Sequence, residues 1–291
     1  ILKHYYYYNI INSKRSIMKK IITIQSNVLN DLVGNQAASL ILGNLSYQVL
    51  QIPTIILSSH KGNKNFIEIP IKNNTPHSFF NALKKLYTFN DDIFLVGYVP
   101  NRKIGNSVIK IIKGQKKVVV DPVMGDTDTG IYVSQDVIKF LPKIIEQASH
   151  ISLNFFEWST LTNKNYLDYD FNEIAKDAKN YCIKNNKILF IRSIIRKNKS
   201  LINMIVSNKE CFYIETPNVK FKKRIDGAGD ISTALFTHYI FTIKDLKKTL
   251  ELTTNQMFNM IKNIKNNKIT IDDVISEKEV FKFKTKSLNN L

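Results

Sequence analysis

Short apolar runs alternate along the chain with longer segments in which apolar residues recur at helical spacing. Ile21–Gln25 is a β-branched run that predicts a strand. In the next segment, Gly34–Leu45, the side chains of Ala37, Leu40 and Ile41 would share one face of a helix. The same alternation continues through most of the chain, and it is typical of an α/β protein.

The strands and helices that this pattern predicts follow each other in regular order. The expected strands are Ile21–Gln25, Gln48–Leu57, Ile93–Tyr98, Lys117–Val120, His150–Leu153, Lys187–Ile191, Leu201–Ser207 and Glu210–Glu215. The last two are separated only by Asn208-Lys209 and predict a hairpin. The expected helices are Gly34–Leu45, Pro76–Tyr87, Ile104–Lys113, Gln135–Glu146, Phe171–Asn185, Gly229–Phe241 and Asp245–Asn263.

Strands buried on both faces, separated by helices, predict a central and mostly parallel β-sheet with helices on both of its faces. The chain has no linker rich in proline, glycine or serine and no internal repeat, so we expect a single α/β domain. Ligands of such sheets bind beyond the carboxyl ends of the strands. Polar residues directly after the strands are therefore the first candidates for a functional site.

The first residues do not fit this alternation. The chain opens with Ile1 and runs through four consecutive tyrosines before Met18, and residues 1–17 lack the apolar core of a signal peptide. They could be a translated upstream stretch, a fragment of a precursor or a degraded targeting segment. We expect residues 1–17 to be a non-conserved or disordered N-terminal extension, with Met18 as the functional start.

The composition bounds the class of protein. Hydrophobic residues make up 44% of the 291 residues, which is enough to bury a large core. No run reaches the roughly 18 consecutive apolar residues that predict a membrane-spanning helix. The two cysteines, Cys182 and Cys211, are too few for a disulfide framework, which favours a reducing, cytoplasmic compartment.

The charge could indicate a nucleic-acid partner. Lysine and arginine total 42 against 24 aspartate and glutamate residues, for a formal net charge of +18. A nucleic-acid-binding surface would concentrate its basic residues on one stripe. Here lysines are scattered and accompany asparagine and isoleucine, as in 163–165 and 262–268. Because codons rich in A and T specify these three amino acids, we interpret the charge as a genome bias and expect no nucleic-acid partner.

A glycine-rich turn, Asp226-Gly227-Ala228-Gly229-Asp230, directly precedes an apolar helix. Two glycines around a small residue let successive backbone N–H groups face one point, and the helix dipole adds positive charge there. Such an anion site suits a phosphoryl group, and Asp230 could accept a proton from an attacking hydroxyl. The alternative is that Asp230 is a helix N-cap and the glycines form an ordinary turn.

Two acidic clusters follow two further strands. Asp121-Pro122-Val123-Met124-Gly125-Asp126 places two carboxylates five residues apart, where they could hold Mg²⁺ through water beside nucleotide phosphates. The other reading is a turn in which Asp-Pro ends the strand. Asn154-Phe155-Phe156-Glu157 follows the next strand, and Glu157 could join the same metal shell or simply occupy the first turn of a helix.

Together, these polar clusters at strand ends and the glycine-rich turn predict a site for phosphoryl transfer. The sequence has no GxxxxGK[ST] motif, so a P-loop is not supported. It has no GxSxG motif and no Cys/His cluster with zinc spacing.

The same motifs resemble those of the pyridoxal kinase family, within the ribokinase-like superfamily. The residues that carry the resemblance are 24–26, Gly34-Asn35, Ser59-His60, Gly97-Tyr98, Asp121–Asp126, Asn154–Glu157 and Gly227–Asp230. They occur in the same order from about Ile21 onward. The Asp121–Asp126 segment followed by 130–133 is the most family-specific part, whereas Gly227–Asp230 indicates only a ribokinase-like kinase.

The resemblance implies a ribokinase-like kinase domain over residues 18–291 that transfers the γ-phosphoryl group of ATP to the 5′-hydroxyl of pyridoxal, and of pyridoxine or pyridoxamine, in vitamin B6 salvage. Asp230 would be the catalytic base, and Gly227, Ala228 and Gly229 would form the anion hole. The implied substrate-binding residues are Ser26, His60, Tyr98 and Asp230.

The resemblance also implies how the nucleotide would be held. Asp121 and Glu157 would organise Mg²⁺ through water, and Ser152 would lie near a monovalent cation such as K⁺. Family members are usually homodimers. The implied ATP-binding residues are Asp121, Asp126, Asn154, Glu157, Arg192 and Ser193.

The sequence departs from the family pattern at several positions. The family usually has His at Asn27, Gly at Asp31 and a Thr-Pro or Pro element before Asn154, and often Thr at Ala228 and Trp near Phe66. Asp31 adds a negative charge close to the substrate loop, which bears on substrate affinity more than on the chemistry. The positions for phosphoryl transfer are kept.

Other functions remain open at this point. A hydroxymethylpyrimidine (phosphate) kinase of thiamine biosynthesis would share the fold, but many members of that group have Cys where Asp230 stands. Sugar kinases of the superfamily match Asp121–Asp126 and Tyr132 less well. A basic nucleic-acid-binding protein and a catalytically inactive descendant are the remaining alternatives.

Overall fold

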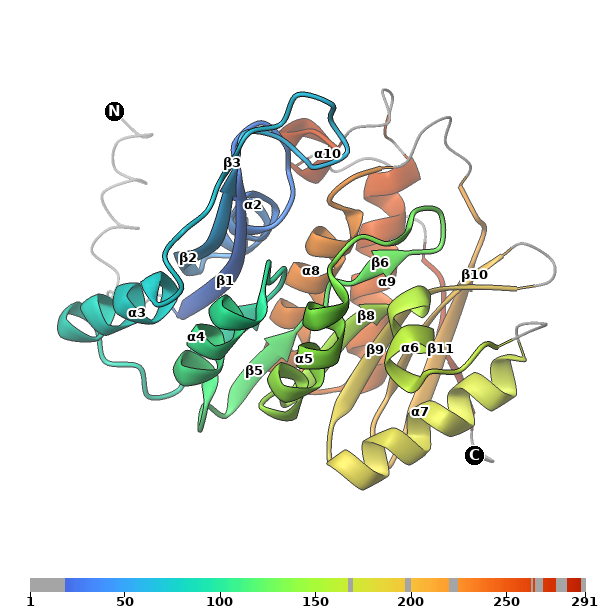
Figure 1. Ribbon diagram of the computed structural model, residues 1–291. Helices are drawn as coiled ribbons and strands as arrows, with labels where there is room; N and C mark the ends of the chain where they lie inside the picture. The colour runs from blue at the N-terminus through green and yellow to red at the C-terminus, as the bar shows by residue number, and fades with distance from the viewer. Residues whose placement is uncertain are drawn as a thin grey trace, which may run out of the picture.

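The computed structural model describes residues 19–166, 170–196, 200–219, 225–262, 264, 269–275 and 282–288. The N-terminal extension expected over residues 1–17 and the expected start at Met18 lie outside the described residues. Figure 1 shows the strands in one large sheet with helices packed along it.

One sheet of ten strands runs through the molecule, in the order β12-β11-β10-β9-β8-β5-β4-β1-β2-β3. The six strands from β9 to β2 in that order are parallel to their neighbours, and the pairs beyond them are antiparallel. The mostly parallel sheet is therefore confirmed. The bounds are β1 Lys20–Val28, β2 Gln48–Leu57, β3 Glu68–Ile69, β4 Ile93–Val96, β5 Lys117–Val120, β8 His150–Asn154, β9 Ile188–Ile195, β10 Leu201–Val206, β11 Cys211–Thr216 and β12 Lys286–Ser287.

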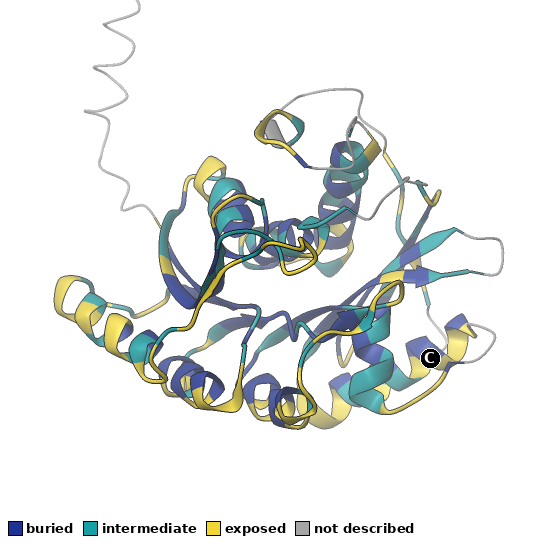
Figure 2. Cartoon of the chain, turned by 45° about the horizontal axis from the view of Figure 1, so that its top comes forward, coloured by how far each residue is buried: buried dark blue, intermediate teal, exposed yellow. Residues whose placement is uncertain are grey.

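Helices cover both faces of the sheet, as Figure 2 shows with the sheet edge-on between two helical layers. One layer packs on the core that contains Phe94 and Trp158, and comprises α3 Thr75–Leu86, α4 Arg102–Ile112, α5 Gln135–Glu146, α6 Phe155–Thr162 and α7 Phe171–Asn185. The other packs on the core that contains Leu95 and Phe236, and comprises α2 Asn35–Asn44, α8 Ala228–Thr242 and α9 Leu246–Lys262. A short helix, α10 Ile271–Ile275, follows α9.

The parallel strands are apolar on both faces because each face meets a helical layer. Val118 and Val120 of β5 point into one core, and Val119 between them points into the other. All three are at most 1% exposed, and burying such side chains stabilises the fold by about 1.5–3 kcal/mol each. This double burial explains the continuous apolar runs in the sequence.

Several elements were not predicted. The two-residue strands β3 and β12 exist only as partners of β2 and β11. The small hairpin β6 Gly125–Asp126 and β7 Gly130–Ile131 forms a sheet of its own. Strands this short carry no periodicity, so only the tertiary partner defines them. Helix α6 was missed because it starts directly at the end of β8 without an intervening turn.

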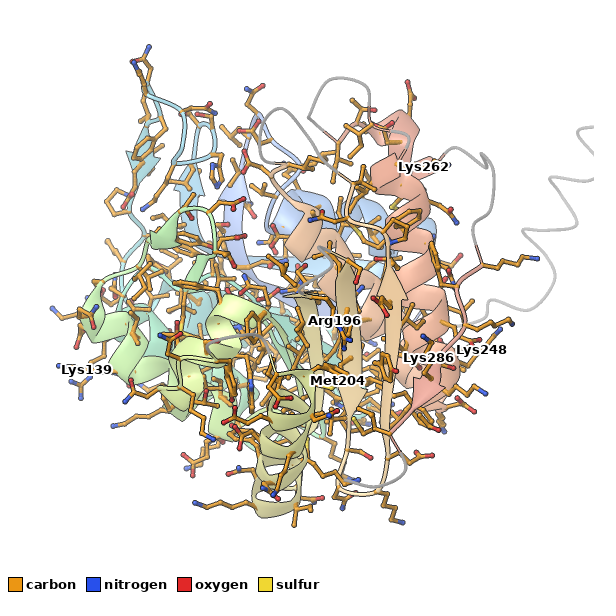
Figure 3. The ribbon with its side chains drawn as sticks, turned by 90° about the vertical axis from the view of Figure 1, so that its right-hand side faces the viewer. Lys139, Arg196, Met204, Lys248, Lys262 and Lys286 are labelled. Carbon is orange, nitrogen blue, oxygen red and sulfur yellow. The ribbon has the colours of Figure 1, made fainter. Side chains whose placement is uncertain are left out.

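The two cysteines are buried, whereas the basic side chains are distributed over the surface. Cys182 and Cys211 are both buried free thiols, and burial raises the pKa of each to about 12. Basic side chains are spread over several elements, and in Figure 3 Lys139 of α5 lies across the molecule from Lys248 of α9 and Lys286 of β12. None of the helices among the described residues combines the length and apolar character needed to cross a bilayer.

Candidate active site

A network of buried polar side chains lies where β5, β8 and β9 end, and Arg192 of β9 is its centre. Its Nη2 donates to Oδ2 of Asp121 at 3.0 Å, just beyond β5. Its Nη1 donates to Oγ1 of Thr233 at 2.8 Å and to the carbonyl oxygen of Gly229, both in α8. Thr233 donates in turn to the same Asp121 oxygen at 2.6 Å. Arg192 thus joins an acidic strand end to the first turn of the helix that carries Asp230.

The charges in this network are held away from water. Arg192 is 6% exposed, Asp121 5% and Glu157 2%. Burial would lower the pKa of Arg192, but the neighbouring charges of Asp121, Glu157 and Asp230 outweigh it and raise that pKa. Two carboxylates therefore share one guanidinium that is always charged. Such a set is stable only while each charge keeps its partners.

Glu157 organises the backbone between β8 and the small hairpin. Its two carboxylate oxygens accept from the N–H groups of Met124, at 3.1 Å, and Asn154, at 2.9 Å. Asn154 accepts from the Glu157 N–H at 2.8 Å and donates to the carbonyl of Gly125 at 3.0 Å. The two residues form a capping box at the start of α6. Burial and the Asp121 charge raise the pKa of Glu157 to about 8, against the opposing effect of Arg192.

The glycine-rich turn adopts a conformation that few other residues could hold. Gly227 is the N-cap of α8 with φ of 84°, and a Cβ there would collide with the carbonyl oxygen of Leu32. The N-cap residue Gly227 has no side chain that could bond to the first-turn N–H groups of α8. Asp230 is the third residue of α8 and not its N-cap, so the alternative reading of Asp230 is wrong. The turn therefore has the backbone conformation that an anion site at a helix N-terminus requires.

A bulge in β9 sets the direction of Arg192. The pairing of β9 with β10 shifts register between Ile202 and Met204, and Ser193 has φ of 59°. The Ser193 N–H donates to Oδ1 of Asn203 at 3.0 Å, while the Ser193 side chain is exposed. A non-glycine residue in this region of φ is held there by its surroundings. Because of the bulge, Arg192 points into the network while its neighbour Ser193 faces solvent.

A second group of predicted residues lies at the ends of β1, β2 and β4. Tyr98 and Phe66 pack on a small apolar cluster formed by Val28, Val33, Ile55 and Leu57. Ser26 is 7% exposed, and its carbonyl and hydroxyl lie so close to Gly34 that a Cβ there would collide with both. His60 belongs to the loop between β2 and β3, and its Nδ1 lies 3.7 Å from Oδ2 of Asp226. This end offers an aromatic ring, hydroxyls and an imidazole to a flat polar ligand.

Not every predicted residue joins the central network. Asp126 ends the short strand β6, in the hairpin that Asn154 holds by its contact with Gly125. Ser152 of β8 is fully buried, and its hydroxyl lies 2.9 Å from that of Thr233. It therefore joins the network through Thr233. Ser193 lies beside the network but faces outward.

Three residues in contact with the site were not among the predicted site residues: Thr233, Asp31 and Asp226. Of these, the sequence analysis had placed only the charge of Asp31 near the substrate loop. Thr233 lies one helical turn after Gly229, so both face Arg192, a spacing that could have been read from the sequence once the helix start was known. Asp31 and Asp226 both contact His60, from loops far apart in the sequence. No local signal predicts that contact.

The carboxylates can be tested as a metal site. Both oxygens of Glu157 accept from backbone N–H groups, and one oxygen of Asp121 accepts from Arg192 and Thr233. Among the described residues, no group of three or more His, Cys, Asp or Glu side chains could hold a metal ion. Arg192 balances the Asp121 carboxylate, and with its pKa raised to about 8 Glu157 carries a proton near neutral pH. These residues alone therefore do not form a complete metal site, and a Mg²⁺ ion here would need water and phosphate oxygens as further ligands.

Comparisons with known proteins agree with this geometry. A family model described as phosphomethylpyrimidine kinase matches residues 75–277. The pyridoxal kinase PdxY of Corynebacterium diphtheriae is 27% identical over 252 residues, covering 83% of this chain and 88% of that protein.

Two solved structures share the fold. Pyridoxal kinase from Entamoeba histolytica has a TM-score of 0.81 at 21% identity, over 94% of this chain and 100% of that one. Pyridoxal kinase from Leishmania donovani, in complex with ADP and pyridoxamine, has a TM-score of 0.78 at 20% identity, over 92% of this chain and 99% of that one. Both likenesses cover nearly all of the compared chains.

Proposed function

The chain belongs to the phosphomethylpyrimidine kinase family of ribokinase-like kinases, and from this premise we propose that it is an ATP-dependent pyridoxal kinase. It would convert pyridoxal, and pyridoxine or pyridoxamine, to the 5′-phosphate in vitamin B6 salvage. The observation that carries the proposal is the bond network in which Arg192 links Asp121 to Gly229, because it fixes an anion site beside acidic strand ends. The relatives named pyridoxal kinase support the same substrate class.

Asp230 is the proposed catalytic base. It would take the proton from the 5′-hydroxyl of the vitamin as that oxygen attacks the γ-phosphorus of ATP and the bond to the bridging oxygen of ADP breaks. The N–H groups of Ala228 and Gly229, at the helix N-terminus capped by Gly227, would stabilise the negative charge on the transferred group. Arg192 supports this by holding the carbonyl of Gly229.

The nucleotide would lie over the buried network. The proposed phosphate-end residues are Asp121, Asp126, Asn154, Glu157, Arg192 and Ser193. Mg²⁺, when bound through water near Asp121 and Glu157, would neutralise phosphate charge. The hairpin that contains Asp126 is tied to Asn154 and is suited to cover the phosphates. We include a K⁺ ion near Ser152 in the same proposal. Comparing kinase activity in K⁺ salts with activity in Na⁺ salts tests it.

The vitamin would lie against Tyr98, with Ser26 and His60 at its edge. The Tyr98 ring and the apolar cluster beneath it give a flat surface for the pyridine ring. The side chains of Ser26 and His60 can each exchange hydrogen bonds with the ring substituents. The proposed vitamin site would therefore combine one apolar wall with a polar rim, which is the usual composition of a small-molecule site.

A direct assay tests the proposal. Purified protein, ATP and Mg²⁺ are combined with pyridoxal, pyridoxine, pyridoxamine or hydroxymethylpyrimidine, and the phosphorylated product is measured for each. We expect the three forms of vitamin B6 to be phosphorylated in preference to hydroxymethylpyrimidine. Preferred turnover of hydroxymethylpyrimidine would instead support the thiamine kinase, and turnover of neither would support an inactive descendant.

Assembly and location complete the proposal. We expect a homodimer that acts in the cytoplasm, on the basis of the family resemblance and the reduced cysteines. Light scattering on the purified protein measures the mass of the assembly, and a monomer would contradict this part of the proposal without affecting the kinase reaction.

A further inference from the structure

Three loops meet at His60, on the vitamin side of the site. The first is residues 29–34 between β1 and α2, the second is residues 58–67 between β2 and β3, and the third is the glycine-rich turn. The second is called the His60 loop below. The turn touches the first loop directly, since only a glycine at position 227 leaves room for the carbonyl of Leu32. The three loops therefore form one continuous rim.

Asp31 of the first loop binds the backbone of the His60 loop. Its Oδ2 accepts from the N–H of His60 at 2.8 Å. This is a charge-assisted hydrogen bond between segments 29 residues apart, and it fixes main chain rather than a rotatable side chain. An alanine or glycine at this position could not make this bond.

Other contacts hold the same loop along its length. The imidazole of His60 lies 3.7 Å from the carboxylate of Asp226, at the start of the glycine-rich turn. Lys61 pairs with Glu68 at 2.7 Å, and its ammonium lies 5.7 Å from the centre of the Tyr98 ring. The His60 loop is thus held over Tyr98 by its neighbours, although its lysines Lys61 and Lys64 face solvent.

We propose that Asp31 is a positioning residue that holds the His60 loop closed over the vitamin pocket, against the glycine-rich turn. The part of this inference that concerns the vitamin rests on the proposed function. Asp31 acts through the backbone of His60. Its loss loosens the loop and weakens binding of the vitamin, while ATP binding and the chemical step are retained.

Limited proteolysis and kinetics test the proposal together. Trypsin cleaves after lysine, so mass spectrometry of fragments beginning at Gly62 or Asn65 reports opening of the His60 loop directly. In Asp31→Ala we expect these fragments to form about tenfold faster than in the parent protein, which is the usual effect of one lost charge-assisted hydrogen bond. The KM for pyridoxal should rise by a similar factor, and the KM for ATP should not change.

Two further variants serve as controls. Asp31→Asn keeps an oxygen that can accept from the His60 N–H, so we expect it to remain close to the parent protein in both measurements. Asp91→Ala removes an exposed carboxylate that pairs with Lys117 where β4 and β5 begin, at the opposite end of the parallel strands from the His60 loop, and it should change neither. The Asn variant separates loss of the bond from loss of charge, and the Asp91 variant separates a local effect from general loosening.

The outcomes distinguish this inference from the proposed function. Faster cleavage at the two lysines in Asp31→Ala supports the positioning role even if pyridoxal proves not to be the substrate. Unchanged cleavage and unchanged KM for pyridoxal in a protein that phosphorylates pyridoxal would overturn the positioning role alone. Cleavage that rises equally in Asp91→Ala would also overturn it.

Discussion

The two ends of the candidate site are built in different ways. At the phosphate end, Arg192, Asp121 and Glu157 are all nearly inaccessible to solvent, and each bonds to backbone or side chains of another element. At the vitamin end, His60 and Asp226 are only partly buried, and their contact of 3.7 Å is longer than a hydrogen bond. Aspartate side chains thus occur in both environments: Asp121 is excluded from solvent, and Asp226 is partly exposed to it.

This difference predicts how much each end loses when one of its residues is changed. A change in a partly solvated loop alters affinity by a modest amount, because water replaces lost partners. A change in a buried charge network leaves an uncompensated charge and costs much more. Burial therefore sets how much stability each end loses when a charged residue is replaced.

Asp230 lies between the two ends, and its replacement tests whether the site is catalytic. We expect Asp230→Asn to lower kcat by roughly 10²- to 10⁴-fold, because an amide cannot accept the proton of the 5′-hydroxyl. Steady-state assays with pyridoxal and ATP measure it. The matched control is Asp136→Asn, an acidic residue in the first turn of α5, which should leave kcat unchanged. Undiminished turnover in Asp230→Asn would rule out its role as base.

Arg192 tests the buried end. Arg192→Met keeps an apolar side chain in place but removes the partner of two buried carboxylates, so we expect the free energy of unfolding to fall by about 3–5 kcal/mol. Urea denaturation followed by circular dichroism measures it. Lys117→Met, which breaks the exposed contact with Asp91, should stay within the scatter of the measurement. Equal effects in both variants would contradict the contrast between the two environments.

Glu157, at the phosphate end, makes the free energy of unfolding depend on pH. Its pKa of about 8 in the folded protein exceeds the ordinary 4.5, so the folded state binds the extra proton between these values. Stability from this group is complete below pH 4.5 and is lost as the pH rises through about 8. Relative to Glu157→Gln, the parent protein should lose about 2 kcal/mol of unfolding free energy between about pH 5.5 and 7.

The same denaturation series contains an opposing contribution. Burial lowers the pKa of His150 to about 4, so this group makes stability rise with pH between about 4 and 6.5. Both proteins contain His150, and the difference between their curves removes it. A difference that stays flat or rises with pH would contradict the protonation assigned to Glu157.

The exposed end should give the smallest effect. Lys61 and Glu68 pair at 2.7 Å with side chains 39% and 37% exposed. We expect Glu68→Gln to change the free energy of unfolding by less than about 1 kcal/mol, because solvent screens the pair and replaces it. The same urea titration measures it. A loss comparable to that of Arg192→Met would show that the vitamin end is as tightly built as the phosphate end.

Much of the fold was predictable because its signals are local. Four predicted elements, Gln48–Leu57, Lys117–Val120, Gln135–Glu146 and Phe171–Asn185, have the observed bounds. The two helices among them begin after Ser134 and Asp170, whose side chains accept from first-turn N–H groups. Apolar periodicity indicates whether a segment is a helix or a strand. The capping residues Ser134 and Asp170 mark where α5 and α7 begin.

The elements that escaped prediction depend on distant partners. Strand β3 is two residues long and exists because it meets Ile56 and Leu57 of β2. The bulge at Ser193 arises from pairing with β10 and from the side chain of Asn203. The sequence of β3 and the sequence around Ser193 carry no local signal that would predict the strand or the bulge.

The sequence by itself determined the α/β alternation, the glycine-rich turn before α8 and the set of acidic residues at the strand ends. Only the tertiary structure decided how those acids are used: Asp121 binds Arg192, Glu157 caps α6, and Asp31 binds the His60 loop. The physical reason is that backbone conformation follows from neighbours along the chain. The partners and burial of a charge follow from residues that the fold brings together from far apart.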